Sequence, residues 1–180
     1  MLFMGEEAAA ETPFLFFCDW QGEAAQLTRD GRRREFAEFS AFSTPEMRDK
    51  IPDPTDEQTF LSSKLNWDAI QHAPRSREFR ALTRELLTLR QEHVVPLIKE
   101  GFARAKAEVF GRDRSAKCLN VIWHTEAESR VQIITNFADT SVPMPKIEGS
   151  IIWNSEREAN PTALGPNQVV VAVETSCVTP

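Results

Sequence analysis

The sequence predicts an α+β protein in which a helical part precedes a part made of antiparallel strands. Residues 1–112 combine aromatic-rich loops with apolar residues at helical spacing, whereas residues 113–180 hold short apolar, β-branched runs separated by turn residues. The polar stretch Gly111-Arg-Asp-Arg-Ser115 separates the two compositions. We therefore expect two units that meet near residue 112.

The apolar run Met1-Leu-Phe-Met4, with the segment that follows to Phe17, has the pattern of a barrel strand and its exit loop. A strand this apolar normally has a paired neighbour on each side. Because no residue before Met1 supplies such a neighbour, we expect the chain to be the C-terminal piece of a larger enzyme.

Helices are expected in the rest of the first part. Asp53 is a candidate N-cap ahead of Pro54, with a short helix through Leu61. Residues 74–94 predict an amphipathic helix with one buried face, because Phe79, Leu82, Leu86 and Leu89 recur at spacings of three and four. Residues 96–110 resume the helical pattern until Gly111 ends it.

Strands are expected in the second part. Four runs have the composition of strands, and their short connections favour antiparallel pairing: Leu119–His124, Val131–Thr135, Ser150–Trp153 and Val169–Val173. With no helix evident among them, we expect a small antiparallel β-sandwich.

Composition narrows the class of protein. The 27 acidic residues exceed the 21 basic ones, giving a net charge of −6, so we expect neither nucleic acid nor a membrane as a partner. The cysteines, Cys18, Cys118 and Cys177, are scattered, which favours a reduced cytoplasmic protein without a metal site. No glycine pattern suits a nucleotide, so we expect no cofactor.

Four residues near the N-terminus are candidates for the rim of a substrate pocket: Glu6, Glu7, Asp19 and Trp20. Residues just past a barrel strand face the active site, and a carboxylate beside an aromatic ring is a common sugar-binding combination. The alternative is that the acids cap helices or are simply solvated.

Other candidates have a structural and a functional interpretation. The run Arg32-Arg-Arg34, placed between Phe36, Phe39 and Phe42, could bind an anion, but structural ion pairs around a loop are the favoured interpretation. Trp123 and Trp153 lie in apolar runs, so we expect them in the core rather than on a glucan-binding surface. His72, His93 and His124 are expected to be structural.

Five segments in order resemble the maltooligosyltrehalose trehalohydrolase family of α-amylase-like glycoside hydrolases: Met1–Glu7, Thr12–Phe17 with Asp19, Gly31–Ala37, Pro52–Pro54 with Thr59-Phe60, and Ser63–Trp67. The resemblance is strong to about residue 95. It implies that residues 1–112 are the last strand and the closing helix of a (β/α)8 barrel, and that residues 113–180 are a C-terminal antiparallel β-sandwich.

The resemblance also implies a function. The family releases trehalose from maltooligosyltrehalose by a retaining mechanism, and its catalytic carboxylates have no counterpart here, so we expect no catalytic residue in this chain and no activity of the chain alone. The implied partners are an α-glucan or maltooligosyltrehalose, through the parent enzyme, and a separate N-terminal barrel portion. The alternatives are a non-catalytic glucan-binding or structural β-sandwich module, or a decayed gene remnant. Trp20 and Asn66 depart from the family pattern, where histidine and aspartate are usual.

Overall fold

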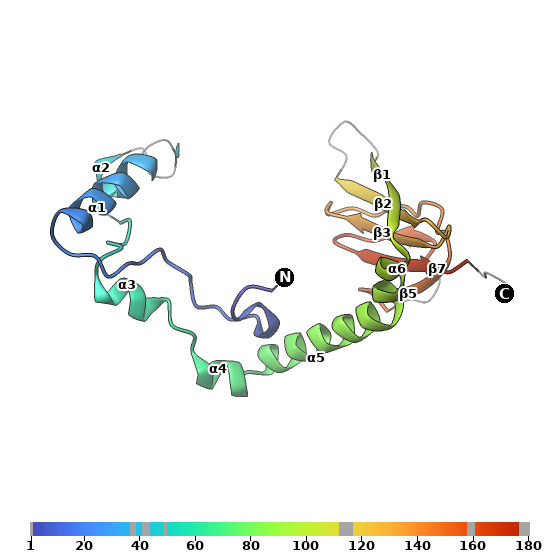
Figure 1. Cartoon of the computed structure of the whole chain (residues 1–180), viewed down its shortest axis with the longest axis horizontal. Coiled ribbons are helices and arrows are strands. Elements are labelled where there is room, and N and C mark those ends of the chain that lie inside the picture. The colour runs from blue at the N-terminus through green and yellow to red at the C-terminus, as the bar shows by residue number, and fades with distance from the viewer. Residues whose placement is uncertain are drawn as a thin grey trace. The chain divides into compact units, whose positions relative to one another are not determined.

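The computed structural model describes residues 2–36, 39–40, 44–48, 50–111, 117–157 and 161–176. The chain forms two compact units, Met1–Thr83 and Arg84–Pro180, each treated by itself below (Figure 1). This division falls inside a helix. The junction expected near residue 112 concerns the domains of a parent enzyme and stays a prediction, since residues 112–115 lie outside the described ranges.

The first unit consists of short helices joined by extended segments. They are η1 (Glu6–Ala8), α1 (Gly22–Phe36), α2 (Pro45–Arg48), α3 (Glu57–Ser62), α4 (Trp67–His72) and the first part of α5 (Pro74–Leu89). Leu2 and Phe3 lie outside any strand, and Met4 begins a turn that leads into η1. The predicted strand is not formed over these residues because no described segment pairs with them.

Two stretches of the first unit run alongside each other. In Figure 1 the extended segment before α1 accompanies the part of the chain that returns through α3 and α4. The backbone N–H of Cys18 donates to the carbonyl of Pro54 at 2.7 Å. The Ser76 hydroxyl, in the first turn of α5, donates to the carbonyl of Ala8 at 2.8 Å. Hydrogen bonds therefore tie the outgoing and returning segments together at both ends.

The cap of α3 differs from the sequence prediction. Asp56, not Asp53, is the N-cap, and its side chain accepts a hydrogen bond from the Gln58 N–H at 2.8 Å. The carboxylate of Asp53 instead folds onto Thr55, accepting from its N–H at 2.9 Å and from its hydroxyl at 2.8 Å. Aspartate competes for local backbone donors in this way, so it forms a turn before the helix rather than the cap itself.

The long helix predicted from residue 74 is confirmed, and helical structure runs on to Glu100. α5 passes through the π-helical turn η3 (Arg90–Val94) into α6 (Val95–Glu100). Pro96 is tolerated because it stands in the first turn of α6, where a missing N–H costs least. The predicted buried face of α5 is only partly covered, since Phe79 and Leu86 are 38% and 37% exposed.

Residues 102–110 form the strand β1 (Phe102–Phe110), so the helix predicted over 96–110 is wrong beyond Gly101. Gly101 has a φ of 84°, and it ends α6 in a conformation that glycine adopts without steric cost. After it, Arg104, Lys106 and Glu108 alternate with alanines, which is the strand period of two. Phe102, Ala105 and Val109 happen to satisfy helical spacing as well.

The second unit contains a five-stranded sheet of order β1-β2-β3-β7-β5 and a separate pair of β4 with β6. These strands are β2 (Cys118–Thr125), β3 (Arg130–Asn136), β4 (Val142–Pro143), β5 (Ser150–Asn154), β6 (Ala163–Leu164) and β7 (Val169–Glu174). The four predicted strands correspond to β2, β3, β5 and β7. Their antiparallel pairing is confirmed.

Two small cores lie on opposite faces of the five-stranded sheet. One joins the sheet to the β4–β6 pair and contains Cys118, Ile134, Val142, Leu164 and Val170. The other joins it to α6 and contains Leu97, Val131 and Val173. The fold is therefore one of helices with a mostly antiparallel sheet, and one face of that sheet carries a helix that the sequence did not predict there.

Candidate functional site

Glu6 and Glu7 lie in the short helix η1. The Glu6 carboxylate accepts a hydrogen bond from the Phe3 N–H at 2.8 Å, which closes the loop that precedes the helix. Gly5 makes this loop possible, because its φ is 85° and a Cβ there would lie 2.7 Å from that of Ala10. Glu6 thus has a structural role, and it also lines a cavity described below.

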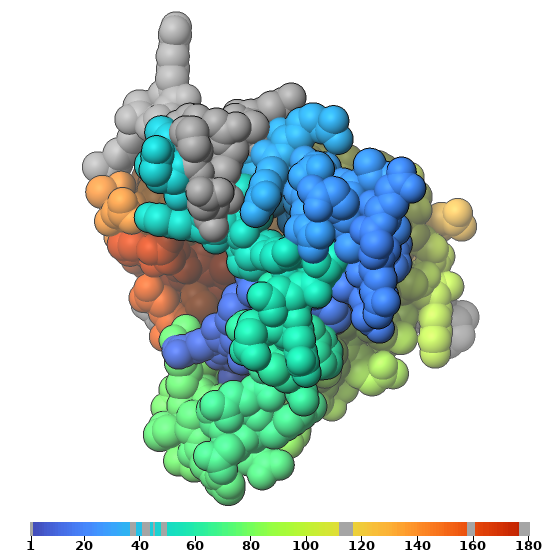
Figure 2. Space-filling model, turned by 90° about the vertical axis from the view of Figure 1, so that its left-hand side faces the viewer, coloured from blue at the N-terminus to red at the C-terminus, as the bar shows by residue number. Residues whose placement is uncertain are grey.

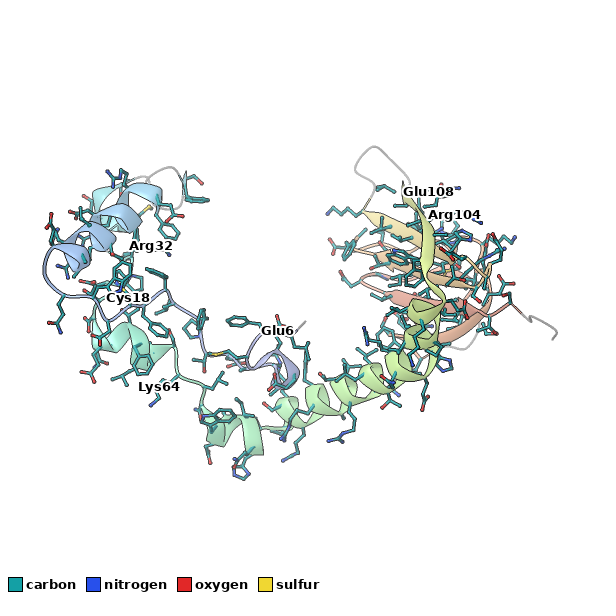
Figure 3. The ribbon with its side chains drawn as sticks, viewed as in Figure 1. Glu6, Cys18, Arg32, Lys64, Arg104 and Glu108 are labelled. Carbon is teal, nitrogen blue, oxygen red and sulfur yellow. The ribbon has the colours of Figure 1, made fainter. Side chains whose placement is uncertain are left out.

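Asp19 and Trp20 lie at the other end of the extended segment, just before α1. Both are exposed, Trp20 by 57%. Figure 3 shows Glu6 far from Cys18, the neighbour of Asp19. The structure therefore separates the four predicted rim residues into two pairs, and their role in substrate binding stays a prediction.

A groove in the first unit is formed by two adjoining cavities of about 450 and 460 Å³. Both are lined by residues 9–12 and by Arg75. One cavity adds the side chains of Phe3, Met4, Glu6, Phe14 and Phe79. The other adds Ser62, Lys64, Asn66 and Ile70. Three of the five family-like segments, around Glu6, Thr12 and Lys64, thus meet at this groove.

Two charged side chains of the groove form an exposed ion pair. Arg75 Nη1 lies 3.3 Å from Glu11 Oε1, across 64 residues of sequence. The same guanidinium lies over the Phe79 ring, 5.6 Å from its centroid. Aromatic rings beside a paired arginine and carboxylate suit a ligand with apolar C–H faces and many hydroxyl groups, because the rings can stack and the charges can accept or donate hydrogen bonds.

The aromatic residues of this unit form a connected row. Phe3, Phe14, Phe17 and Phe60 contact one another edge to face, with centroids 4.9 to 6.0 Å apart. The row extends the apolar wall of the groove toward α3. Figure 2 shows α1, in blue, beside the teal residues of the α3 segment. The rings thus join the extended segment to the returning chain.

Arg32 of α1 has a structural role in this region, as the favoured sequence interpretation predicted. Its guanidinium lies between the rings of Phe16 and Phe36, 4.9 and 4.6 Å from their centroids, and its Nη1 lies 3.1 Å from Glu35 Oε2. These contacts fix α1 to the extended segment. Ala37 and Phe42, which belong to the predicted basic and aromatic segment, lie outside the described residues.

Asn66, which replaces the usual aspartate of the family, is the N-cap of α4. Its side-chain oxygen accepts a hydrogen bond from the Ala69 N–H at 3.0 Å. Asparagine and aspartate cap helices equally well. This departure therefore leaves the local structure intact and does not itself indicate a decayed copy.

In the part of the chain that the structure describes, two carboxyl groups have a lowered pKa. For Asp53, desolvation raises the pKa, but hydrogen bonds from Thr55 and the charge of Arg29 outweigh it and lower the pKa below the usual value. For Glu128, hydrogen bonds and charge from Arg104 lower the pKa. Both groups are thereby kept ionised, whereas a general acid of a glycosidase needs a raised pKa.

The remaining candidates of the sequence analysis lie in varied surroundings. Trp123 and Trp153 are both half-buried, and Trp123 packs against the core of Leu97, Val131 and Val173.

Among the described residues, no group of three or more His, Cys, Asp or Glu is placed to hold a metal ion. None of the described helices is long and apolar enough to span a bilayer. Cys177 lies outside the described residues.

Comparison with known proteins gives consistent relatives. No family model matches the chain. It is 48% identical over 95 residues to the malto-oligosyltrehalose trehalohydrolase of Deinococcus radiodurans, covering 53% of this chain and 15% of that protein. The enzyme of the same name from Rhizobium sp. is 35% identical over 147 residues, 81% of this chain and 22% of that one. The enzyme of that name from Brevibacterium helvolum is 31% identical over 162 residues, which are 89% of this chain and 25% of that one.

The fold has a close counterpart among solved structures. A crystal structure at 1.4 Å of a Salmonella typhimurium protein, named there as a candidate α-amylase, aligns with a TM-score of 0.78 and 32% identity. It covers 96% of this chain and 27% of that one.

The matches extend through both units, because an alignment of 147 residues is longer than either. They also show that the chain spans only about a seventh to a quarter of these three curated relatives, between 15% and 25% of their length. In sequence and fold, the chain is therefore similar to part of the length of malto-oligosyltrehalose trehalohydrolases and of an α-amylase-like structure.

Proposed function

We propose that this chain is the C-terminal part of a glycoside hydrolase that releases trehalose from maltooligosyltrehalose. In this proposal the first unit and α5 supply the last strand and closing helix of a (β/α)8 barrel, and the five-stranded sheet with the β4–β6 pair is the C-terminal β-sandwich. Leu2–Met4 would then pair with neighbouring barrel strands, and the exposed apolar face of α5 would cover them.

The observation that carries the proposal is the groove around Arg75. Its walls include residues of three family-like segments, and they combine the rings of Phe3, Phe14 and Phe79 with the Arg75–Glu11 pair. A pyranose presents an apolar face to a ring and hydroxyl groups to charged side chains. The groove is thus the part of this chain that we assign to α-glucan binding, with Glu6 on its rim.

The chain alone is expected to be inactive. A retaining glycosidase needs two carboxyl groups about 5–5.5 Å apart, one as nucleophile and one as acid. The family residues in these roles lie on earlier barrel strands. The ionised carboxylates of Asp53 and Glu128 are committed to structural pairs with Arg29 and Arg104.

The test measures trehalose release from maltooligosyltrehalose with the chain alone, with the N-terminal portion of the Brevibacterium helvolum relative alone, and with both. We expect release only from the mixture. Phe14→Ala in the chain should then raise KM several-fold, because it removes a ring of the groove, whereas Phe137→Ala, exposed on the second unit, should leave KM unchanged.

Two outcomes would contradict the proposal. Trehalose release by the purified chain alone would show that the catalytic carboxylates are present after all. Binding of maltooligosaccharides that survives Phe14→Ala but is lost with Trp153→Ala would instead identify the alternative, a glucan-binding module built on the sheet.

A further inference from the structure

The strand β1 is an open edge of the five-stranded sheet. It stands first in the order β1-β2-β3-β7-β5, and among the described residues it pairs only with β2. Residues 102–109 are all exposed, Val109 by 67%. An edge strand this long presents a row of unpaired N–H and C=O groups, which is a template for another strand.

The side chains of β1 are complementary to those of an identical strand running antiparallel. With Lys106 on the two-fold axis, Arg104 lies opposite Glu108 of the second copy, and Glu108 opposite its Arg104. Opposite charges in directly facing positions stabilise an antiparallel pair. Figure 3 labels Arg104 and Glu108, both on β1.

The other facing positions are compatible with this register. Ala105 lies opposite Ala107 of the second copy, so small side chains meet on the face of the sheet that carries α6. Lys106 faces Lys106 of the second copy, and these like charges are unfavourable. Each Lys106 also lies diagonal to Glu108 of the other copy, which its long side chain can reach. The register change after Phe102 limits the pairing to residues 104–108, because residues 109 and 110 would face 103 and 102 of the second copy.

Arg104 also has partners within its own sheet. Its guanidinium holds Glu128 through two hydrogen bonds of 3.2 and 3.0 Å, and Nη2 lies 3.4 Å from Nδ1 of His124. Arginine has five N–H donors, so it can keep Glu128 and still reach a second carboxylate.

We propose that β1 is a self-association edge, at which two copies of this chain pair antiparallel about Lys106 and form one continuous ten-stranded sheet. The partner is a second copy because the charge order of the strand, positive at 104 and negative at 108, is self-complementary in this register. The inference does not depend on the proposed glucan site.

The test uses the full chain and exchanges charges. Arg104→Glu and Glu108→Arg each place like charges opposite one another at both ends of the pair, so each should raise the dimer dissociation constant about tenfold or more. The double variant Arg104→Glu/Glu108→Arg restores opposite charges and should dimerise like the original chain. Sedimentation velocity over about 1 to 100 µM measures all of these constants.

A mixture gives the sharpest result. Arg104→Glu alone and Glu108→Arg alone are expected to be monomeric, but mixed together they place glutamates opposite arginines at both positions and should form a heterodimer. Glu128→Gln is the control for the lost intrachain pair and should leave the dimer in place. Lys106→Gln removes the like charges on the axis and should tighten it, although it makes the chain more negative.

These outcomes separate pairing at β1 from other causes. A monomeric original chain over that range would overturn the proposal. Equal association of the original chain and both single variants would do so as well, since association through the apolar surfaces of the first unit does not respond to the sign of charge on β1. Trehalose release in the reconstitution experiment is scored separately, so failure of one proposal is distinguishable from failure of the other.

Discussion

The two units of this chain differ in what holds them together. Among the described residues, the buried apolar side chains of the first unit are Ala8, Ala25 and Ile70. The second unit buries nine, including Leu97, Ile134, Leu164 and Val170, each at 1% exposure or less. The first unit relies on hydrogen bonds, edge-to-face rings and arginine stacking, and the second on two apolar cores.

This difference shows what each unit can do alone. Burial of apolar side chains is the main favourable contribution to folding, so the second unit has the means of independent stability. The first unit leaves Phe14, Phe16, Trp20 and Trp67 between 47% and 63% exposed. Exposed apolar surface of this extent marks an interaction site, which agrees with the proposal that a larger enzyme body covers it.

Hydrogen exchange should give the largest contrast between the units. We expect backbone N–H groups of β3 to exchange slower than those of η1 and residues 10–21 by a factor of about a thousand or more, because the former open only with the sheet and the latter by local fluctuation. Mass spectrometry of peptides from the intact chain measures both rates. Equal protection in the two regions would contradict the greater stability expected of the second unit.

Ile134→Ala should be the most damaging single substitution of those considered. Ile134 is 0% exposed in the core beneath the β4–β6 pair, and a cavity of that size costs about 3–4 kcal/mol of unfolding free energy. Urea denaturation followed by circular dichroism measures it. Leu27→Ala, at a position 65% exposed on α1, is the control and should change stability by less than about 0.5 kcal/mol.

Asp53→Ala should destabilise the first unit by roughly 1–2 kcal/mol, since it removes the hydrogen bonds to Thr55 and the pair with Arg29. The pKa of Asp53 is lowered in the folded state. Its contribution is therefore fully present above the unfolded pKa of about 3.9 and is lost as the pH falls through the lower folded pKa.

The original chain and Asp53→Ala should thus differ at pH 6 and converge in acid. Exchange rates of backbone N–H groups near α3 report this at each pH. Asp30→Ala, an exposed carboxylate on α1, serves as the control. A difference that grows as the pH falls would contradict the assigned role of Asp53.

The smallest effect is expected at Asn66. Asn66→Ala removes the N-cap of α4 and should cost about 1 kcal/mol, whereas Asn66→Asp keeps the acceptor and should be nearly neutral. Thermal unfolding compares the two. If both substitutions were equally harmful, the amide itself would matter, and Asn66 would have a role in the groove beyond capping.

The sheet could be largely predicted from the sequence because its strands are continuous β-branched runs. Val131–Thr135 and Val169–Val173 have this composition, and β3 and β7 pair where expected. β1 was missed because alanines carry little β signal and its apolar residues also fit a helix. Asp53 and Asp56 are only three residues apart. The sequence pattern could not decide which of the two aspartates caps α3.

The groove was predictable only in part. Glu6 lines a cavity because the turn at Gly5 is local, and its predicted place on the rim of a substrate pocket stays a prediction. Arg75 and Glu11 were not foreseen. Their pairing depends on the return of the chain over 64 residues, and neither residue has a neighbour in sequence that marks it as part of a site.

The π-helical turn η3 sets the rotational phase of α6. A π turn holds one residue more than an α-helical turn, and each α-helical residue advances the side-chain direction by about 100°. Leu97, 1% exposed, reaches Val131 and Val173 only in the phase that this extra residue gives. A one-residue deletion within Arg90–Val94 would therefore rotate Leu97 away from the sheet and turn a neighbouring side chain toward it. The length of this turn is thus a condition of the second core, although none of its own residues is buried there.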